Sequence, residues 1–479
     1  MFPRLRAHSF AMSLVVLFAT QFSHAGTLLA GTDPKDGSAN SFAAMQSQSS
    51  TQADSQQAPG TPSGEAVNLD VSVGSNWPMF KNQTSRLSSN PFERTVNRDN
   101  AVFLSLSWVG LLGDLVDFSS PAVSNGVVYI ASLDGNLYAF NANGCGQSSC
   151  NPLWVGAMNS NFSSVSSPAV ASGMVYVGSE DHKMYVFAAA GCGHNTCPPL
   201  WTGNTAGAVF SSPVVSGNVV YVGSEDHRLY AFPANGCGRS TCTPLWAGNT
   251  GGAIDSSPAL GNGMVYVGSQ DGKLYAWNAA GCGGLFCKPL WTAQAGASIF
   301  GSSPAVSNGQ VYIASFSEPN SSNSKLYSFN ATGCGAPTCQ PLWSAPAGDF
   351  VTSSPAVANG RVYIGSGDDL MYVFDANGCH MPTCNFLWRG EAIGAQAALL
   401  STPAVANGVV YVGENNGMVE VFDANGCGDS ICLPLTQLRT NNEQIVSSSP
   451  AVVNGTVYFG SADQFSPPIG RLYVFKLSR

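Results

Sequence analysis

The sequence predicts an all-β fold, an eight-bladed β-propeller built from four-stranded antiparallel blades. Three observations lead to this fold. A Ser-Ser-Pro motif or a close variant recurs eight times, a cysteine-bracketed loop recurs seven times, and the last repeat lacks its fourth strand. The prolines of the motif follow one another at intervals of about 47 residues, a period typical of propeller blades. These prolines are Pro121, Pro168, Pro213, Pro258, Pro304, Pro355, Pro403 and Pro450.

The repeat that begins at Ser119 illustrates the strands of one blade. "SSPAVSNG" predicts a short strand and an Asn-Gly turn, and "VVYIASLDG" predicts a second strand that ends in an Asp-Gly hairpin turn. "NLYAFNANG" predicts the third strand and "PLWVG" the fourth. The small residues of the first strand suit the crowded centre of a propeller, and the tryptophan of the fourth suits the wider gap between blades near the rim.

The two ends of the repeat region complement each other. The last repeat starts at Ser448 and ends after its third strand, whereas residues 103–110 ("FLSLSWVG") form an unpaired fourth strand before the first repeat. Pairing this strand with residues 472–475 completes an eighth blade. We therefore expect a ring closed by the N-terminal strand, because closure removes the sheet edges that would otherwise promote aggregation.

All 14 cysteines fall into seven pairs with the same spacing, and no cysteine is left over. Each pair lies between the third and fourth predicted strands, so we expect it on the outer part of a blade. We favour local disulfides over zinc, because neighbouring blades diverge at this radius and no histidine is spaced to complete a metal site. The pairs are Cys145/Cys150, Cys192/Cys197, Cys237/Cys242, Cys282/Cys287, Cys334/Cys339, Cys379/Cys384 and Cys427/Cys432.

The N-terminal region predicts export from the cytoplasm. Residues 1–25 have the pattern of a secretory signal peptide, with a basic start, a short apolar run and small residues before the expected cleavage site. Residues 26–74 are rich in Ser, Gln, Gly and Pro, which predicts a flexible linker ahead of a propeller over residues 75–479. We expect a secreted or periplasmic protein without a transmembrane segment or a lipid-attachment cysteine.

The net charge of −9 and the absence of a basic stripe argue against nucleic-acid binding. We expect a monomer whose partner is a protein or a glycan.

The repeat "SSPAVSNGVVYIASLDGNLYAFNANG", followed by "PLW", resembles the repeat of the pyrroloquinoline-quinone-type propellers. The resemblance covers about residues 76–479. It implies one of two roles. Some members are quinoprotein dehydrogenases that hold the quinone and Ca²⁺ at the propeller axis, and others are scaffolds such as the outer-membrane assembly propeller. This sequence departs from both, since it has no adjacent cysteines, no Cys-x-x-Cys-His haem site and no lipidation cysteine.

The loops between the second and third strands carry the candidate binding residues. These loops share one face with the loops that enter each first strand, where Asp117 and Asp255 lie. Carboxylates and an amide around one opening could hold Ca²⁺, although the same residues are also common in turns. The candidate binding face consists of Asp181, His182, Asp226, His227, Asp271, Asp368, Asp369 and Asn415.

These observations favour a non-enzymatic binding or scaffold protein for an envelope or extracellular protein or glycan. The alternative is a quinoprotein dehydrogenase that oxidises an alcohol or sugar with a Ca²⁺-bound pyrroloquinoline quinone. We assign no catalytic, cofactor-binding or metal-ligating residue, because no nucleophile signature occurs and every cysteine is already paired.

Overall fold

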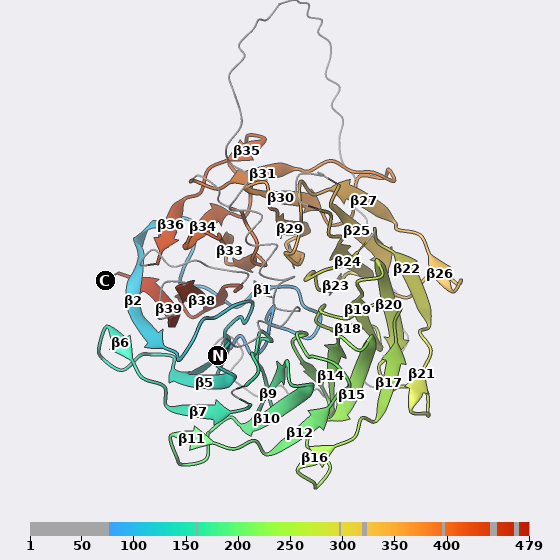
Figure 1. Ribbon diagram of the computed structural model, residues 1–479. Coiled ribbons are helices and arrows are strands. Elements are labelled where there is room, and N and C mark those ends of the chain that lie inside the picture. The colour runs from blue at the N-terminus through green and yellow to red at the C-terminus, as the bar shows by residue number, and fades with distance from the viewer. Residues whose placement is uncertain are drawn as a thin grey trace, which may run out of the picture.

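The computed structural model describes residues 76–159, 161–296, 298–318, 323–394, 398–440, 448–463 and 469–478. In this part of the chain, eight sheets surround a common axis as a closed ring (Figure 1). The predicted eight-bladed propeller is therefore confirmed. The predicted signal peptide and linker lie outside the described residues. The blades are numbered 1 to 8 in the order of their Ser-Ser-Pro motifs, and their strands A to D run from the axis to the rim.

The first four blades contain strands A to D in the following order. Blade 1 has β3 (Ala122–Ser124), β4 (Val127–Ser132), β5 (Asn136–Asn141) and β7 (Trp154–Ala157), and blade 2 has β8 (Ala169–Ala171), β9 (Met174–Ser179), β10 (Lys183–Ala188) and β12 (Trp201–Asn204). Blade 3 has β13 (Val214–Ser216), β14 (Val219–Ser224), β15 (Arg228–Pro233) and β17 (Trp246–Asn249). Blade 4 has β18 (Ala259–Gly261), β19 (Met264–Gly268), β20 (Lys273–Asn278) and β22 (Trp291–Gln294).

The second half of the ring repeats this order. Blade 5 has β23 (Ala305–Ser307), β24 (Gln310–Ala314), β25 (Lys325–Asn330) and β27 (Trp343–Pro346), and blade 6 has β28 (Ala356–Ala358), β29 (Arg361–Gly365), β30 (Leu370–Asp375) and β31 (Trp388–Glu391). Blade 7 has β32 (Ala404–Ala406), β33 (Val409–Gly413), β34 (Met418–Asp423) and β36 (Thr436–Arg439). Blade 8 has β37 (Ala451–Val453), β38 (Thr456–Asp463), β39 (Ile469–Leu477) and β2 (Leu104–Leu111).

The N-terminal strand β2 closes the ring. It follows the 3-10 helix η1 (Ala101–Phe103) and pairs with β39 in an antiparallel register that runs from Leu104 opposite Leu477 to Leu111 opposite Arg471. Figure 1 shows this strand beside the C-terminal strands β38 and β39. The predicted closure of blade 8 is thus confirmed.

The Ser-Ser-Pro motif builds a closed ring of hydrogen bonds around the axis. In every blade, the backbone N–H of the second motif residue donates to the side-chain hydroxyl of the same residue in the next blade. The donor and acceptor residues are Ser120 to Ser167, Ser167 to Ser212, Ser212 to Ser257, Ser257 to Ser303, Ser303 to Ser354, Ser354 to Thr402, Thr402 to Ser449 and Ser449 to Ser120. The N···O distances lie between 2.8 Å for Ser449 to Ser120 and 3.2 Å for Ser354 to Thr402. The last blade thereby bonds to the first without a gap.

The first serine of each motif bonds within its own blade. Its hydroxyl accepts a hydrogen bond from a backbone N–H of strand B, as from Gly223 to Ser211 in blade 3. The same contact occurs in all eight blades. One serine therefore fixes strand A to its own blade while the other fixes it to the next blade, which explains why both positions recur.

The cysteine loops connect neighbouring blades at the rim. Each loop is closed by a disulfide with the expected pairing, and in six loops the second half adds a short parallel strand to strand D of the preceding blade. These short strands are β6 (Ser149–Cys150), β11 (Thr196–Cys197), β16 (Thr241–Cys242), β21 (Phe286–Cys287), β26 (Thr338–Cys339) and β35 (Ile431–Cys432). They lie at the outer edge of the ring in Figure 1. The spacing of the cysteines predicts a staple within one hairpin, and it does not reveal this second contact.

The loop of blade 6 makes the same inter-blade contact through a single bridge. Ser344 of β27 pairs in parallel with Thr383, and the Cys384 N–H donates to the Ser344 carbonyl at 2.8 Å. The disulfide between Cys379 and Cys384 has the expected pairing, but these residues form no two-residue strand.

The pairs lie on the outer part of the blades, as expected, but the second cysteine of each pair is buried there. Only 3% of Cys384 is exposed, and it packs in one apolar cluster with Trp343 and Phe374. Its neighbour Thr383 is exposed, because successive residues of an extended segment point to opposite sides. The pairing with the preceding blade therefore turns the second cysteine inward. The buried cysteines are Cys150, Cys197, Cys242, Cys287, Cys339, Cys384 and Cys432.

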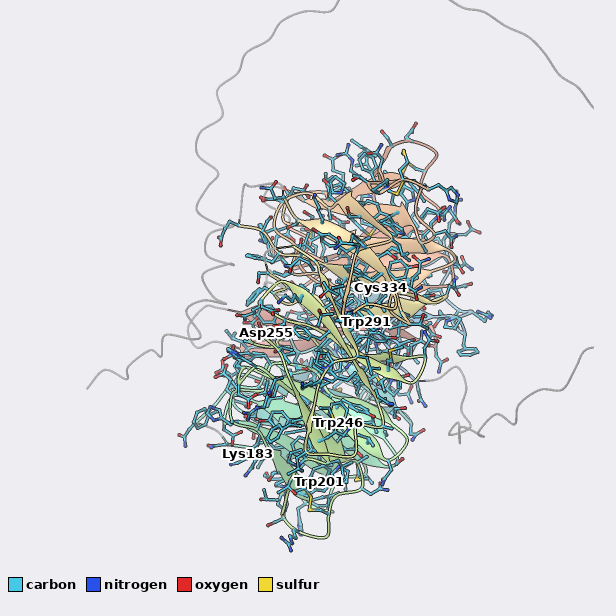
Figure 2. All side chains as sticks on the ribbon, turned by 90° about the vertical axis from the view of Figure 1, so that its right-hand side faces the viewer. Lys183, Trp201, Trp246, Asp255, Trp291 and Cys334 are labelled. Carbon is cyan, nitrogen blue, oxygen red and sulfur yellow. A yellow bond between two sulfur atoms is a disulfide. The ribbon has the colours of Figure 1, made fainter. Side chains whose placement is uncertain are left out.

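A buried tryptophan lies beneath each loop. The glycine before the first cysteine packs so closely on the tryptophan of the preceding blade that a Cβ at Gly236 would lie 2.9 Å from the Trp201 ring. Figure 2 shows three of these tryptophans, Trp201, Trp246 and Trp291, in successive blades. Glycine is required here both for this contact and for its positive φ, which is 77° at Gly236.

Blade 7 lacks the tryptophan, and blade 8 lacks the loop that would cover it. Strand D of blade 7 begins with Thr436 where six other blades begin with tryptophan. A further inter-blade contact is missing at the same junction. The tyrosine hydroxyl of strand B donates to a backbone carbonyl of the next blade in the other seven blades, whereas the Tyr411 hydroxyl has no partner. The tryptophan, the tyrosine contact and the disulfide loop therefore form one junction unit.

The segment before β2 crosses the centre of the ring. Its residues 77–90 hydrogen-bond to the inner strand or the motif residues of every blade, mostly through their backbone. Strand β1 (Ser89–Asn90) pairs in parallel with β32 of blade 7. The blades are bonded through Val123, Val170, Pro213, Leu260, Val306, Val357, Val405 and Val452. In Figure 1 this segment lies in the middle of the propeller, beside the label of β1.

The hydroxyl ring is testable by a single substitution. Ser212→Ala removes the acceptor of the buried Ser167 N–H and leaves that donor without a partner, so we expect a loss of about 1–3 kcal/mol in the free energy of unfolding, measured by urea denaturation. The exposed Ser216→Ala, on the same blade, should change the free energy by no more than about 0.5 kcal/mol. Equal stability of the two variants would contradict a stabilising ring.

The rim junction is testable in blade 3. Replacing Cys237 and Cys242 together by serine should lower the free energy of unfolding by roughly 2 kcal/mol through loss of loop closure. Because this loop covers Trp201 of blade 2, the tryptophan fluorescence should also shift to longer wavelength. Arg239→Ala, an exposed change in the same loop, serves as the control. An unchanged emission spectrum in the double variant would show that the loop does not cover the tryptophan.

Candidate functional site

The predicted binding face exists as one side of the disc, but most of its carboxylates are turned inward. In five blades the aspartate of the B–C turn accepts a hydrogen bond from a tyrosine hydroxyl four residues later. The O···O distance is 2.6 Å between Asp181 and Tyr185. Only 2% of the Asp181 side chain is exposed, 10% of Asp226 and 15% of Asp271. The alternative that these aspartates are turn residues therefore describes them, because each one supports its own hairpin.

The other candidates on this face divide into two groups. His182, His227 and Asp369 have positive φ angles of 69°, 69° and 67°, in turn positions where other blades have glycine. Both imidazoles are exposed, whereas Asp369 is half-buried and Asn415 is buried. The candidate residues do not converge on one point, since they belong to turns of different blades. A partner on this face would meet the two histidines before it met any of the predicted carboxylates.

A second group of acids surrounds the axial opening on the same face. Asp117 and Asp255 lie in loops that enter strand A, and Glu180 and Glu225 lie in B–C turns. Burial, together with the smaller effect of the Glu180 charge, raises the pKa of Asp117 to about 8. Burial, followed by the charges of Asp255 and Glu180, raises the pKa of Glu225 to about 7. The mouth of the axis therefore carries acids that titrate near neutral pH, and its negative charge increases as the pH rises.

Of the two aspartates in loops that enter strand A, Asp255 is the more deeply buried. Its Oδ2 accepts a hydrogen bond of 2.6 Å from the Gln270 amide, whereas Oδ1 has no partner. Burial raises its pKa to about 6, and the Gln270 hydrogen bond opposes this shift. In Figure 2, Asp255 and Lys183 lie toward the same side of the disc.

The axial cavity behind this mouth is small. It has a volume of about 60 Å³ and is lined by Phe80, Phe118, Phe210, Asp255 and the hydroxyls of the serine ring. Sites for drug-sized ligands and cofactors usually have about 300–1,000 Å³. A cavity of this size has room for one or two water molecules, each of which takes about 30 Å³ in the liquid.

Two cations of the crossing segment fill the axis below the cavity. Arg86 is fully buried and donates to the carbonyls of Phe80, Ser212, Pro213 and Pro258. Lys81 Nζ lies 3.3 Å and 3.4 Å from the carbonyls of Ser303 and Pro304. Burial lowers the pKa of Arg86 to about 9, and burial together with the Arg86 charge lowers that of Lys81 well below its usual value. Backbone carbonyls of blades 3, 4 and 5 thus bind side chains of this same chain.

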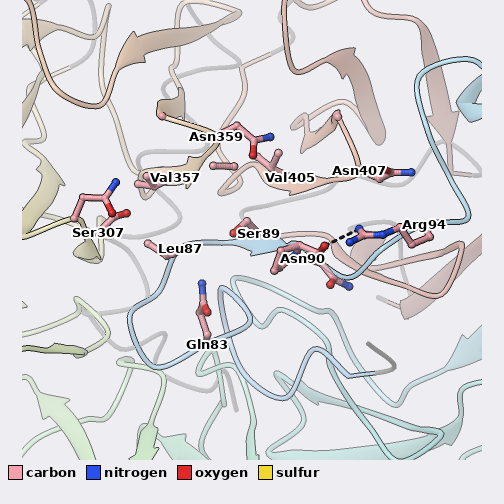
Figure 3. Close-up of a pocket in the computed structure, with 15 residues that line it drawn as sticks. Gln83, Leu87, Ser89, Asn90, Arg94, Ser307, Val357, Asn359, Val405 and Asn407 are labelled. Atoms are coloured by element: carbon pink, nitrogen blue, oxygen red, sulfur yellow. Dashed lines mark hydrogen bonds between the residues drawn. The ribbon is translucent and has the colours of Figure 1, made fainter. Parts of the chain in front are cut away.

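The opposite face carries a larger pocket, which the sequence analysis missed. Its volume is about 650 Å³, and it lies between residues 83–94 and the A–B turns of blades 5, 6 and 7. Figure 3 shows Gln83, Ser89 and Arg94 on the crossing segment, with Asn359 and Asn407 on the turns opposite. Amide, hydroxyl and guanidinium groups line it together with a few valines. The Asn-Gly turns are nearly identical in sequence, so they give no sign of a pocket. The pocket forms because the crossing segment lies beside three of these turns.

No three His, Cys, Asp or Glu side chains come together as a metal-ligand set within the described residues. The described part of the chain also has no helix with the length and apolar character needed to span a bilayer.

Comparison with known proteins confirms the resemblance to the pyrroloquinoline-quinone-type repeat. The model of the family described as outer membrane protein assembly factor BamB matches residues 237–336 and 290–470. No curated protein matches the sequence.

Several solved structures share the fold at low sequence identity. BamB from Moraxella catarrhalis aligns with a TM-score of 0.57 and 17% identity over 78% of this chain and 98% of its own. The quinohemoprotein alcohol dehydrogenase from Comamonas testosteroni aligns with a TM-score of 0.61 and 13% identity over 85% of this chain and 81% of its own. A europium-containing methanol dehydrogenase aligns with a TM-score of 0.61 and 13% identity over 84% of this chain and 98% of its own. At these identities the likeness concerns the fold, which BamB and the two dehydrogenases share.

The acidic mouth has a testable pH dependence. The pKa of Asp255 is higher in the folded state than its unfolded value of 3.8, so its contribution to stability is complete below pH 4 and is lost as the pH rises through about 6. We expect Asp255→Asn to gain about 2–3 kcal/mol relative to the wild type between pH 4 and pH 7, measured by urea denaturation at each pH. The exposed Asp429→Asn should show no such trend. Parallel pH profiles of wild type and Asp255→Asn would refute the assignment.

Proposed function

We propose that this chain, a propeller with the pyrroloquinoline-quinone-type repeat, is a non-enzymatic scaffold that binds a protein or glycan in the cell envelope or outside the cell. The observation that carries the proposal is the occupied axis. Lys81 and Arg86 bind the carbonyls at the centre of the ring, and phenylalanines cover them, so that a cavity of about 60 Å³ remains. Side chains of this chain therefore occupy the axis, where they stabilise the fold.

The location outside the cytoplasm is supported by the disulfides. Seven bridges occur, and no cysteine is free. Disulfides persist in oxidising compartments and are rare in the cytosol. The predicted signal peptide at residues 1–25 agrees with this location.

A partner could bind either face of the disc. The face with the Asn-Gly turns suits binding better because it has the larger pocket. The pocket of about 650 Å³ there is within the range of small-molecule and peptide sites. Its amides and hydroxyls could pair with polar groups of a loop or a sugar. Arg94 adds a cation whose Nη1 donates to the carbonyls of Pro91 and Glu93. The cavity at the acidic mouth on the other face is smaller, about 60 Å³, and this face suits electrostatic attraction of a cationic partner.

The alternative is a quinone-dependent dehydrogenase. It draws on the resemblance to dehydrogenases of this fold, and such a cofactor would need the axis. The described side chains there do not fit a multi-ring quinone, because they leave a space of only about 60 Å³. We therefore derive no redox step for this protein.

Cofactor reconstitution tests the proposal directly. Purified protein incubated with pyrroloquinoline quinone and Ca²⁺, then freed of unbound quinone, should have no quinone absorbance and should not reduce an electron-accepting dye when alcohols or sugars are added. A quinoprotein dehydrogenase stripped of its cofactor and treated in the same way is the positive control. Stoichiometric quinone uptake with substrate-dependent dye reduction would reject the scaffold proposal in favour of the dehydrogenase.

A further inference from the structure

Blade 7 departs from the others at a buried position of its B–C hairpin. Blade 3 has a Ser-x-Asp-x-x-x-Tyr pattern, in which Ser224, Asp226 and Tyr230 support the turn. The same three positions in blade 7 are occupied by Glu414, Asn416 and Glu420. A small hydroxyl and a phenol are thus both replaced by carboxyl groups.

The strand register brings the two glutamates together. Val412 of β33 pairs with Glu420 of β34, and the Glu414 N–H donates to the Met418 carbonyl at 2.7 Å. Side chains two residues apart on a strand point to the same face. Glu414 and Glu420 are therefore diagonal neighbours on one face of the hairpin, and neither has any exposed surface.

This hairpin holds an excess of oxygen atoms without donors. Glu420 Oε1 accepts hydrogen bonds from the Ile393 N–H at 2.9 Å and from Gln437 Nε2 at 2.7 Å. Five other oxygens have no hydrogen-bond donor, and they are Glu414 Oε1, Glu414 Oε2, Asn415 Oδ1, Asn416 Oδ1 and Glu420 Oε2. The Asn416 side chain interacts with the Glu414 carboxyl but does not meet hydrogen-bond geometry.

Unpaired buried acceptors are costly, so the oxygens of Glu414, Asn416 and Glu420 among these five need a common partner. A single proton shared between the glutamates would satisfy one pair of oxygens and leave the amide oxygens unpaired. A hard divalent cation would satisfy carboxylate and amide oxygens together. Ca²⁺ in particular takes 6–8 oxygen ligands, among them side-chain amide carbonyls, in a flexible geometry.

We propose that blade 7 binds one Ca²⁺ ion through Glu414, Asn416 and Glu420. The two carboxyl groups and the Asn416 amide oxygen are the protein ligands of this site. Asn416 is half-buried at the tip of the turn and provides the entry route. The site lies inside one hairpin, and none of its residues lines the axial cavity.

Calorimetric titration of the EDTA-dialysed protein with CaCl₂ tests the site. We expect one Ca²⁺ per chain. The triple variant Glu414→Ser, Asn416→Asp and Glu420→Tyr restores the arrangement of blade 3, so it should fold normally and bind Ca²⁺ at least tenfold more weakly. The isosteric Glu420→Gln should weaken binding in the same direction. Asp226→Asn, at the matching position of blade 3, should leave the affinity unchanged.

The pH dependence separates a cation from a shared proton. Burial and the neighbouring Glu420 raise the pKa of Glu414, so without Ca²⁺ the stability of the wild type should fall as the pH rises above about 4.5. Saturating Ca²⁺ should remove the part of this decline that Glu414 causes, and the triple variant should show only the decline caused by the acids of the axial mouth, with and without Ca²⁺. The proposal is overturned if the wild type takes up no stoichiometric Ca²⁺, or if the triple variant takes it up with wild-type affinity.

Discussion

The closed ring of hydroxyl-to-amide hydrogen bonds around the axis is the constraint on which the rest of the molecule depends. Each second motif residue donates its N–H to one neighbour and accepts at its hydroxyl from the other. The ring admits only small residues at this position, and it leaves carbonyls of the same inner segments facing the axis. Those carbonyls need donors, which Lys81 and Arg86 supply. The geometry of the ring thus accounts for the crossing segment, and the crossing segment accounts for the small axial cavity and for the pocket beyond it.

The rim solves a different problem, because blades diverge with distance from the axis and leave a gap that side chains must fill. A tryptophan from one blade and a disulfide loop from the next fill it together. The junction between blades 7 and 8 shows that the two parts depend on each other, since Thr436 replaces the tryptophan where no loop follows and the Tyr411 hydroxyl loses its carbonyl acceptor. A loop without its tryptophan would have nothing to pack on, and a tryptophan without its loop would be exposed at the rim.

Features that repeat could be predicted from the sequence, and features that occur once could not. The number of blades, the closing strand and the disulfide pairing follow from the recurring Ser-Ser-Pro motif and the recurring cysteine pairs. The pairing of aspartate with tyrosine was also within reach, because Asp-x-x-x-Tyr recurs in five blades, as in Asp226 and Tyr230. The role of Arg86 could not be predicted, since its partners in the blades lie 126 to 172 residues away and are backbone carbonyls, which carry no side-chain signal. A backbone carbonyl is the same at every position, so a sequence does not reveal which carbonyls lack donors.

The separation between ring and hairpin also explains how blade 7 tolerates its unusual acids. Its motif residues remain in the common network, with Ser401 accepting from the Gly413 N–H at 2.7 Å and Thr402 bonded to both neighbours. The glutamates lie farther along strands B and C, in contacts that do not pass through the ring. In a repeat protein each unit is held mainly by its neighbours, so one unit can change its interior while the others keep the assembly closed. Chemical differences are therefore least costly at the hairpin ends of a blade, which is where Glu414 and Glu420 lie.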